Sequence, residues 1–352
     1  MAGMPGMSSH FTGQLPLAPS SVPAPGQPAG TYDPTLRVTA LGGGHGLSAT
    51  LRALRLIAGE ITAVVTVADD GGSSGRIRRE MDVLPPGDLR MALAALCDDT
   101  DWGRTWRDVM QHRFTSKEGT EATLDNHSLG NLLIVALWEL LGDPVGGLRW
   151  AGALLGARGQ VLPMSTVPLA ISGAVLSENE KGELVRRTVT GQSSLAAAGK
   201  NTRVSHIRLE PENAPACEES MEAIELSDWI VLGPGSWYTS VLPHLLLPEL
   251  RDALVRTPAR KALVMNLTTD TAETSGMNAA DHLEVIHHYA PDLRLDVVIA
   301  DQDAVQDAQG FVDAAERLGA AVLFSRVGAG SGTPIHDPLR LALAFQEAFK
   351  GS

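Results

Sequence analysis

The 352-residue chain has few cysteines, few aromatic residues and a shortage of positive charge. Its two cysteines, Cys97 and Cys217, are too few for a disulfide framework or a cysteine-rich metal site, so we expect a reducing, cytoplasmic environment. The formal net charge of −13 argues against nucleic acid as a partner, because cations that neutralise phosphates supply most of that affinity. Local hydrogen-bond donors would therefore have to hold any small anionic ligand.

Long apolar runs are also missing. The longest apolar helix candidate, 129–141, is interrupted by Asn131 and Glu139 and is shorter than the ~20 residues that a bilayer crossing needs. Residues 1–35 lack the basic start and apolar stretch of a signal peptide. They are rich in Pro, Gly, Ala and Ser and carry no Asp, Glu, Lys or Arg before Asp33. We expect a disordered leader over 1–35, a single domain over 36–350 and no membrane insertion.

Strand-like and helix-like stretches alternate after the leader. Runs rich in Val, Ile, Leu and Ala on both faces predict strands buried between helices, at 36–41, 61–67, 228–232, 261–267, 294–299 and 320–325. Helices are expected over 47–58, 88–96, 128–141 and 145–156, with Ser128 as an N-cap. This alternation predicts an α/β fold with a Rossmann-like, doubly wound, mostly parallel sheet. Shorter alternating stretches at 169–176 and 184–190 indicate a small β-rich insertion around 160–210.

Two glycine-rich turns each follow a predicted strand. The first reads Gly42-Gly43-Gly44-His45-Gly46 and the second reads Gly233-Pro234-Gly235-Ser236. Such turns leave backbone N–H groups unpaired at a helix N-terminus, and glycine lets a ligand approach them, so both are suited to bind anions such as phosphates. The first turn matches neither the dinucleotide fingerprint nor a Walker A loop. A sharp structural turn without a ligand is the alternative interpretation.

A polar cluster follows the second predicted strand. Because ligands of open α/β sheets lie beyond the carboxyl ends of strands, Asp69 and Asp70 should stand beside the first glycine turn. Their carboxylates could accept hydrogen bonds from ribose hydroxyls, hold Mg²⁺ between phosphates, or only cap the loop. Ser73, Ser74 and Arg76 add donors at the same rim. Arg76 could instead pair with one of the two aspartates.

Further polar residues lie at or near predicted helix starts. Asp88 either caps its helix or faces the site. Asn131 lies inside an apolar helix and needs a partner if buried, either a ligand or a neighbouring turn. His45 and His127 are the histidines of interest, but nothing in the sequence places them together. A metal site built on them is therefore not expected.

Five motifs in chain order, at 42–48, 66–76, 86–90, 127–132 and 233–242, together resemble the gluconeogenesis factor family. This is the YvcK-like branch of the CofD-like superfamily, which includes 2-phospho-L-lactate transferase, and the resemblance extends over roughly 36–349. It implies a Rossmann-like cytoplasmic protein that binds UDP-sugars, UDP-N-acetylglucosamine in particular. It also implies a role in growth on gluconeogenic carbon sources, in cell shape and in cell-wall (peptidoglycan) synthesis. No catalysed reaction is firmly attached to this branch.

The assignment to this branch depends on specific positions of the sequence. The stretches 71–76 and 233–240 resemble the gluconeogenesis factors, whereas the transferase has a deazaflavin-binding segment and a Pro-Ser-Asn-Pro type turn there. Met277 departs from the branch, because a tyrosine that helps hold the uridine-sugar is common at that place. The residues predicted to bind the ligand are Gly42, Gly43, Gly44, His45, Gly46, Asp69, Asp70, Ser73, Ser74, Arg76, Asn131, Gly233, Gly235, Ser236 and Asn266.

Three functional hypotheses are compatible with the sequence. The first is a non-catalytic regulator that binds UDP-N-acetylglucosamine and acts through an unidentified protein partner, with a homodimer as a further option. The second is a Mg²⁺-dependent transferase of a phosphate-linked group, with Asp69, Asp70 and His45 in the reaction. The third is a scaffold with a vestigial pocket. Two anion-binding turns without an evident catalytic constellation favour the regulator.

Overall fold

The computed structural model describes residues 32–116, 123–178, 184–191, 194–195, 203–269, 271, 273–330 and 334–350. Seven strands form its central sheet: β1 (Asp33–Gly42), β2 (Ala58–Val65), β3 (Gln160–Pro163), β7 (Trp229–Leu232), β8 (Arg260–Val264), β9 (Val297–Ala300) and β10 (Ala321–Phe324). They lie in the order β10-β9-β8-β7-β1-β2-β3, and each neighbouring pair is parallel. The predicted Rossmann-like, mostly parallel fold is confirmed.

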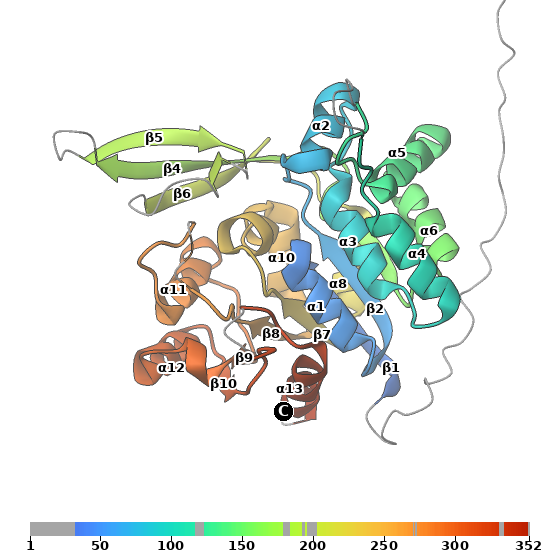
Figure 1. Cartoon of the computed structure of the whole chain (residues 1–352). Coiled ribbons are helices and arrows are strands. Elements are labelled where there is room, and N and C mark those ends of the chain that lie inside the picture. The colour runs from blue at the N-terminus through green and yellow to red at the C-terminus, as the bar shows by residue number, and fades with distance from the viewer. Residues whose placement is uncertain are drawn as a thin grey trace, which may run out of the picture.

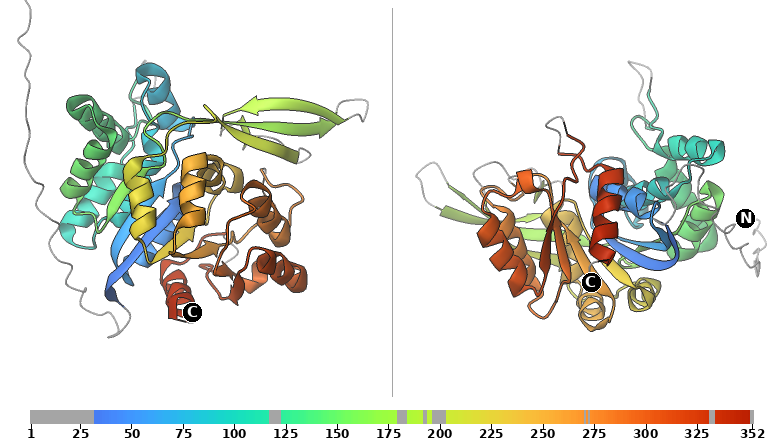
Figure 2. Two further views of the ribbon diagram at one scale, coloured as in Figure 1. Left: turned by 180° about the vertical axis from the view of Figure 1, so that it is seen from behind. Right: turned by 90° about the horizontal axis from the view of Figure 1, so that it is seen from below.

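Helices cover both faces of this sheet. They are α1 (Gly44–Leu54), α2 (Gly72–Met81), α3 (Pro86–Leu96), α4 (Asp101–Gln111), α5 (Leu129–Leu141), α6 (Pro144–Leu155), α8 (Glu218–Leu226), α9 (Pro243–Leu246), α10 (Pro248–Arg256), α11 (Ala279–Tyr289), α12 (Ala308–Arg317) and α13 (Pro338–Lys350), with a π-helical turn η1 (Trp237–Val241) and a 3-10 turn η2 (Gln302–Ala304). Helix α1 lies in front of the sheet in Figure 1, and α8 and α10 cover the opposite face, as the view from behind in Figure 2 shows. No helix in the described part of the chain is both long and apolar enough to cross a membrane.

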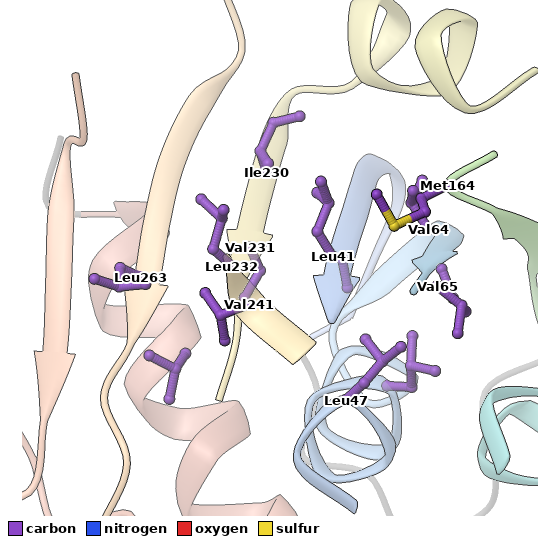
Figure 3. Packing of buried hydrophobic residues seen from close by; sticks show 14 of the residues in the cluster. Leu41, Leu47, Val64, Val65, Met164, Ile230, Val231, Leu232, Val241 and Leu263 are labelled. Atoms are coloured by element: carbon purple, nitrogen blue, oxygen red, sulfur yellow. The ribbon is translucent and has the colours of Figure 1, made fainter. Parts of the chain in front are cut away.

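The core lies between the sheet and these helices. Strands β7 and β9 read Trp-Ile-Val-Leu and Val-Val-Ile-Ala, and all eight side chains are buried. A parallel strand covered on both faces has no solvated side, so both faces must be apolar. Figure 3 shows side chains from β1, β2, β7 and β8, among them Leu41, Val64 and Leu263, packed with Leu47 of α1.

The order of the strands creates a switch point beside β1. The chain passes from β1 to β2 and β3 on one side, and it builds β7, β8, β9 and β10 outward on the other. Connections after β1 and β7 therefore leave the sheet in opposite directions. A crevice at the carboxyl ends of such diverging strands is where open α/β sheets bind ligands.

A second, antiparallel sheet projects from the main body beside α2 (Figure 1). It consists of β4 (Ala170–Glu178), β5 (Leu184–Thr190) and β6 (Arg203–Glu210), in the order β5-β4-β6. The predicted boundary at residue 160 is corrected, because β3 pairs in parallel with β2 and belongs to the main sheet. Its four residues were too few to separate from the following strands by pattern alone.

Element ends required other corrections. Strand β1 begins at Asp33, so the end of the predicted leader is part of the sheet, while residues 1–31 lie outside the described chain. Helix α1 ends at Leu54, because Ala58 already pairs within β2. Ser128 is the N-cap residue of α5, as predicted, but its side chain does not cap the helix. Its hydroxyl donates to the Met110 carbonyl at 3.1 Å.

Candidate functional site

The two glycine turns lie in contact at the switch point. Gly42 ends β1 and Gly43 is the N-cap of α1, while Gly233 follows β7 directly. A Cβ atom on Gly46 would lie only 2.1 Å from the Pro234 carbonyl oxygen, so only a glycine permits this approach. Thr50 further joins the turns, because its hydroxyl donates to the Gly233 carbonyl at 2.9 Å.

A pocket of about 540 Å³ opens where the turns meet. The predicted site residues that line it are Gly43, Gly44, His45, Gly46, Gly235, Ser236 and Asn266. The other predicted residues do not line it: Gly42, Asp69, Asp70, Ser73, Ser74, Arg76, Asn131 and Gly233. Gly42 and Gly233 nevertheless belong to the two turns that form its wall.

The first glycine turn places backbone donors in the lining of this pocket. The first N–H groups of an α-helix have no acceptor within the helix, and those of His45 and Gly46 lie in the first turn of α1. Gly44 has a φ of +57°, which favours glycine, and its N–H is hydrogen-bonded to the Asp88 carboxylate. The helix dipole adds partial positive charge at the same place.

Asp88 is the acidic residue at the first turn. It lies in the first turn of α3 and lines the pocket, and a Cβ atom on Gly43 would be 2.4 Å from its Oδ2. Burial, and to a smaller extent the nearby charge of Asp69, raises the pKa of Asp88 to about 7. The hydrogen bond from the Gly44 N–H and the positive charge of Arg90 lower this pKa. A mixture of neutral and ionised Asp88 therefore exists near neutral pH.

Asn266 and Glu273 hold the second turn. The Asn266 amide accepts from the Gly235 N–H at 2.9 Å and donates to the Gly235 carbonyl at 2.7 Å. The buried Glu273 carboxylate accepts from the Ser236 hydroxyl at 2.6 Å and from the Tyr238 N–H at 3.3 Å. A carboxylate of the chain itself thus occupies the start of η1, where negative charge is favoured.

Asp69 and Asp70 face different neighbours. Asp69 is half-buried, and this partial desolvation raises its pKa, while its Oδ1 accepts from the Gly71 N–H at 2.9 Å. Asp70 lies against Gly191, where an added Cβ atom would be 1.9 Å from Asp70 Oδ2. In the described parts of the chain, no group of three or more His, Cys, Asp or Glu residues is arranged to hold a metal ion.

Ser73 and Asn131 belong to a buried polar network outside the lining of the pocket. The Ser73 hydroxyl is hydrogen-bonded to His127 Nδ1 at 3.1 Å and accepts from Asn131 Nδ2 at 3.1 Å. Asn131 Oδ1 in turn accepts from Arg90 Nε at 2.9 Å. The partner that Asn131 needs is therefore supplied by neighbouring side chains. Arg76 pairs with neither aspartate and donates to the Asp125 carbonyl at 2.7 Å.

This network makes a prediction about stability. Asn131→Ala should lower the free energy of unfolding by about 2 kcal/mol, because the change leaves buried partners unsatisfied. Since Asn131 does not line the pocket, the folded variant should keep its affinity for any ligand bound there. Urea unfolding followed by ligand titration checks both expectations. Lost affinity with unchanged stability would instead place Asn131 in the binding site.

Several pocket residues were missed from the sequence. They are Ala49, Trp237, Ser240, Leu267, Thr268, Thr271, Glu273, Thr274, Pro334, Ile335 and His336. Those at 267–274 follow β8, and the rule that ligands lie beyond strand carboxyl ends could have found them. The segment 334–336 precedes α13 and carries no local signal. Met277 does not line the pocket and lies 3.7 Å from the Tyr238 hydroxyl, measured to its sulfur.

The fold and the site define the class of this protein. This is a doubly wound α/β protein with a pocket between two glycine turns at the switch point of its sheet. The sequence model of the family described as 2-phospho-L-lactate transferase CofD matches residues 38–319. The chain is also similar to solved structures, one of them a UPF0052 family protein from Bacillus halodurans. That protein is 34% identical with a TM-score of 0.76, and the match covers 88% of this chain and 98% of that one.

Curated relatives specify the family further. A putative gluconeogenesis factor of Mycobacterium tuberculosis is 46% identical over 308 residues, which cover 87% of this chain and 88% of the relative. The gluconeogenesis factor of Bacillus subtilis is 36% identical over 271 residues, covering 77% of this chain and 80% of that protein. The chain belongs to the gluconeogenesis factor family, within the CofD-like proteins. The resemblance found in the five sequence motifs is confirmed.

Proposed function

We propose that this protein binds a nucleotide-sugar in the pocket between the glycine turns, with UDP-N-acetylglucosamine as the first candidate. The meeting of the two turns at the switch point carries this proposal, because it places His45 and Gly46, in the first turn of α1, in the lining of one cavity. A diphosphate would bind there. Leu267 and Ile335, the latter 61% exposed, offer apolar surface to the rest of the ligand.

The size and energetics of the pocket support this proposal. Its volume of about 540 Å³ lies within the roughly 300–1,000 Å³ usual for small-molecule sites. Micromolar affinity needs about 8 kcal/mol. Hydrogen bonds to charged groups contribute about 1.5–3 kcal/mol each, so a few N–H bonds and apolar contacts suffice.

The pocket would hold a diphosphate mostly without fixed cations. Among the described residues its lining includes His45 and His336 but neither lysine nor arginine. Glu273 is already engaged by the second turn, and Asp88 is partly protonated near neutrality. Helix-terminal N–H groups and a neutral Asp88 would therefore bind the phosphates, with Mg²⁺ as an optional companion of the nucleotide.

The proposed role is regulatory. The relatives are named gluconeogenesis factors, which is said of those proteins, and we extend it here to a regulator of carbon flux and of cell shape through wall synthesis. Such a regulator would act in the cytoplasm through a protein partner, as a monomer or a homodimer. The transferase from which the family model takes its name is the competing hypothesis, and ligand turnover separates the two.

The test is an isothermal titration with UDP-N-acetylglucosamine and Mg²⁺, followed by chromatography of the recovered ligand. Saturable binding of intact ligand is expected. Asn266→Ala should weaken it at least about tenfold, or about 1.4 kcal/mol, because Gly235 loses both amide hydrogen bonds. Asn213→Ala, at an exposed loop position outside the pocket, is the matched control and should bind like the wild type. No saturable binding would contradict the proposal, and cleaved ligand would favour the transferase.

A further inference from the structure

A second hollow adjoins the pocket along the carboxyl edge of the sheet. Its volume is about 500 Å³, and it shares Leu267, Thr268 and Pro334 with the first as common walls. The first pocket lies beyond β1 and β7, and the second continues it past the ends of β9 and β10. Strands β9 and β10 and helix α13 lie together in Figure 1. A ligand longer than the first pocket would therefore extend into the second.

Two arginines distinguish the second hollow from the first. Arg326 follows β10 and Arg340 lies in α13, and both line the hollow. Arg340 donates to the Gly328 carbonyl, which orients its guanidinium along this wall. Arg326 is exposed and, within the described chain, makes no hydrogen bond or ion pair. An unpaired guanidinium in a protein of net charge −13 is available for an acidic ligand group.

Two carboxylates, those of Asp301 and Asp303, line the same hollow as the arginines. Asp301 Oδ2 accepts from the N–H groups of Val327 and Gly328 at 3.0 and 3.1 Å, which fixes the turn after β10. Asp301 Oδ1 accepts from the Asp303 N–H at 3.2 Å. No ion pair joins Asp301 or Asp303 to Arg326 or Arg340 in the described residues. The turn thus presents Arg326 without neutralising it.

We propose that the second hollow is a subsite for an acidic group on the sugar side of the ligand, held by Arg326 and Arg340. This inference rests on the proposed function, since the diphosphate is placed at the glycine turns. A nucleobase carries no acidic group at neutral pH, so the acid must belong to the other end of the molecule. Guanidinium groups bind carboxylates and phosphates through paired, charge-assisted hydrogen bonds. The subsite would therefore add affinity for a nucleotide-sugar that bears an acid on its sugar, relative to the neutral counterpart of the same ligand.

UDP-glucuronic acid and UDP-glucose are the probes, because they differ only in a carboxylate in place of a hydroxymethyl group. The wild type should bind the acid about tenfold more tightly, an effect that falls with added salt. Arg326→Met should bring the two affinities to within about twofold of each other while leaving that for UDP-glucose unchanged. Arg52→Met removes the same charge from an exposed position of α1 outside both hollows and should keep the preference.

The outcomes separate this inference from the proposed function. Equal affinities of the wild type for both probes, or a preference that survives Arg326→Met, would overturn the acidic subsite while leaving nucleotide-sugar binding intact. If UDP-N-acetylglucosamine binds and neither probe does, the subsite is overturned while the proposed function stands. If none of the three binds, the proposed function fails and the subsite with it. Thermal unfolding of each variant, measured in the same buffer, shows that the compared proteins are folded.

Discussion

Gly46→Ala is expected to lower the free energy of unfolding by at least about 2 kcal/mol and to weaken ligand binding at least about tenfold. In a helix interior, alanine is normally more stabilising than glycine by about 1 kcal/mol. Here its Cβ atom would lie 2.1 Å from the Pro234 carbonyl oxygen and 2.9 Å from the Gly235 Cα atom. The two glycine turns must separate to make room, and the pocket between them changes shape. Urea unfolding and titration with UDP-N-acetylglucosamine measure the two effects.

Gly152 provides the matched control, because it is also a helical glycine that can be changed to alanine. A Cβ atom there would meet its nearest neighbour at 3.7 Å, an ordinary contact. Gly152→Ala should leave binding unchanged and should be neutral or slightly stabilising. If both variants behave alike, the contact between the turns is not what requires glycine at Gly46.

Asp88→Asn is expected to remove a large pH dependence of stability. The folded pKa of Asp88, about 7, lies above its ordinary value of 3.8, so the folded state binds this proton more tightly than the unfolded chain. The stability that this group contributes is fully present below about pH 4 and is lost as pH rises through about 7. The full loss amounts to about 4 kcal/mol. The free energy of unfolding should be measured at several pH values between 4 and 8. Its value for Asp88→Asn should increase relative to that of the wild type as the pH rises.

Asp101→Asn is the control for this series. Asp101 also lies in the first turn of a helix, but its side chain is almost fully exposed. Its replacement should leave a nearly constant difference from the wild type. The same burial of Asp88 predicts that binding of a phosphate ligand weakens in the wild type above about pH 7, where two negative charges would meet. A pH-independent difference between Asp88→Asn and the wild type would show that Asp88 is ionised throughout this range.

Local sequence patterns specified much of the fold. Apolar runs identified six strands of the main sheet, since a strand buried on both faces must be apolar throughout. The glycine turns were equally visible, because positive φ at Gly44 and Gly233 favours glycine and the close approach at Gly46 requires it. Strand β3 was assigned to the wrong sheet because four residues contain too little pattern.

The sequence by itself determined the α/β class, the family and the two turns that form the pocket wall. Only the tertiary structure decided which polar side chains reach that pocket. Asp69 and Asp70 are adjacent in the chain yet face Gly71 and Gly191, while Asp88 and Glu273 arrive at the turns from distant segments. Secondary structure and turns follow from short-range backbone preferences. The partners of a side chain follow from long-range packing, which places residues far apart in the sequence within hydrogen-bond distance.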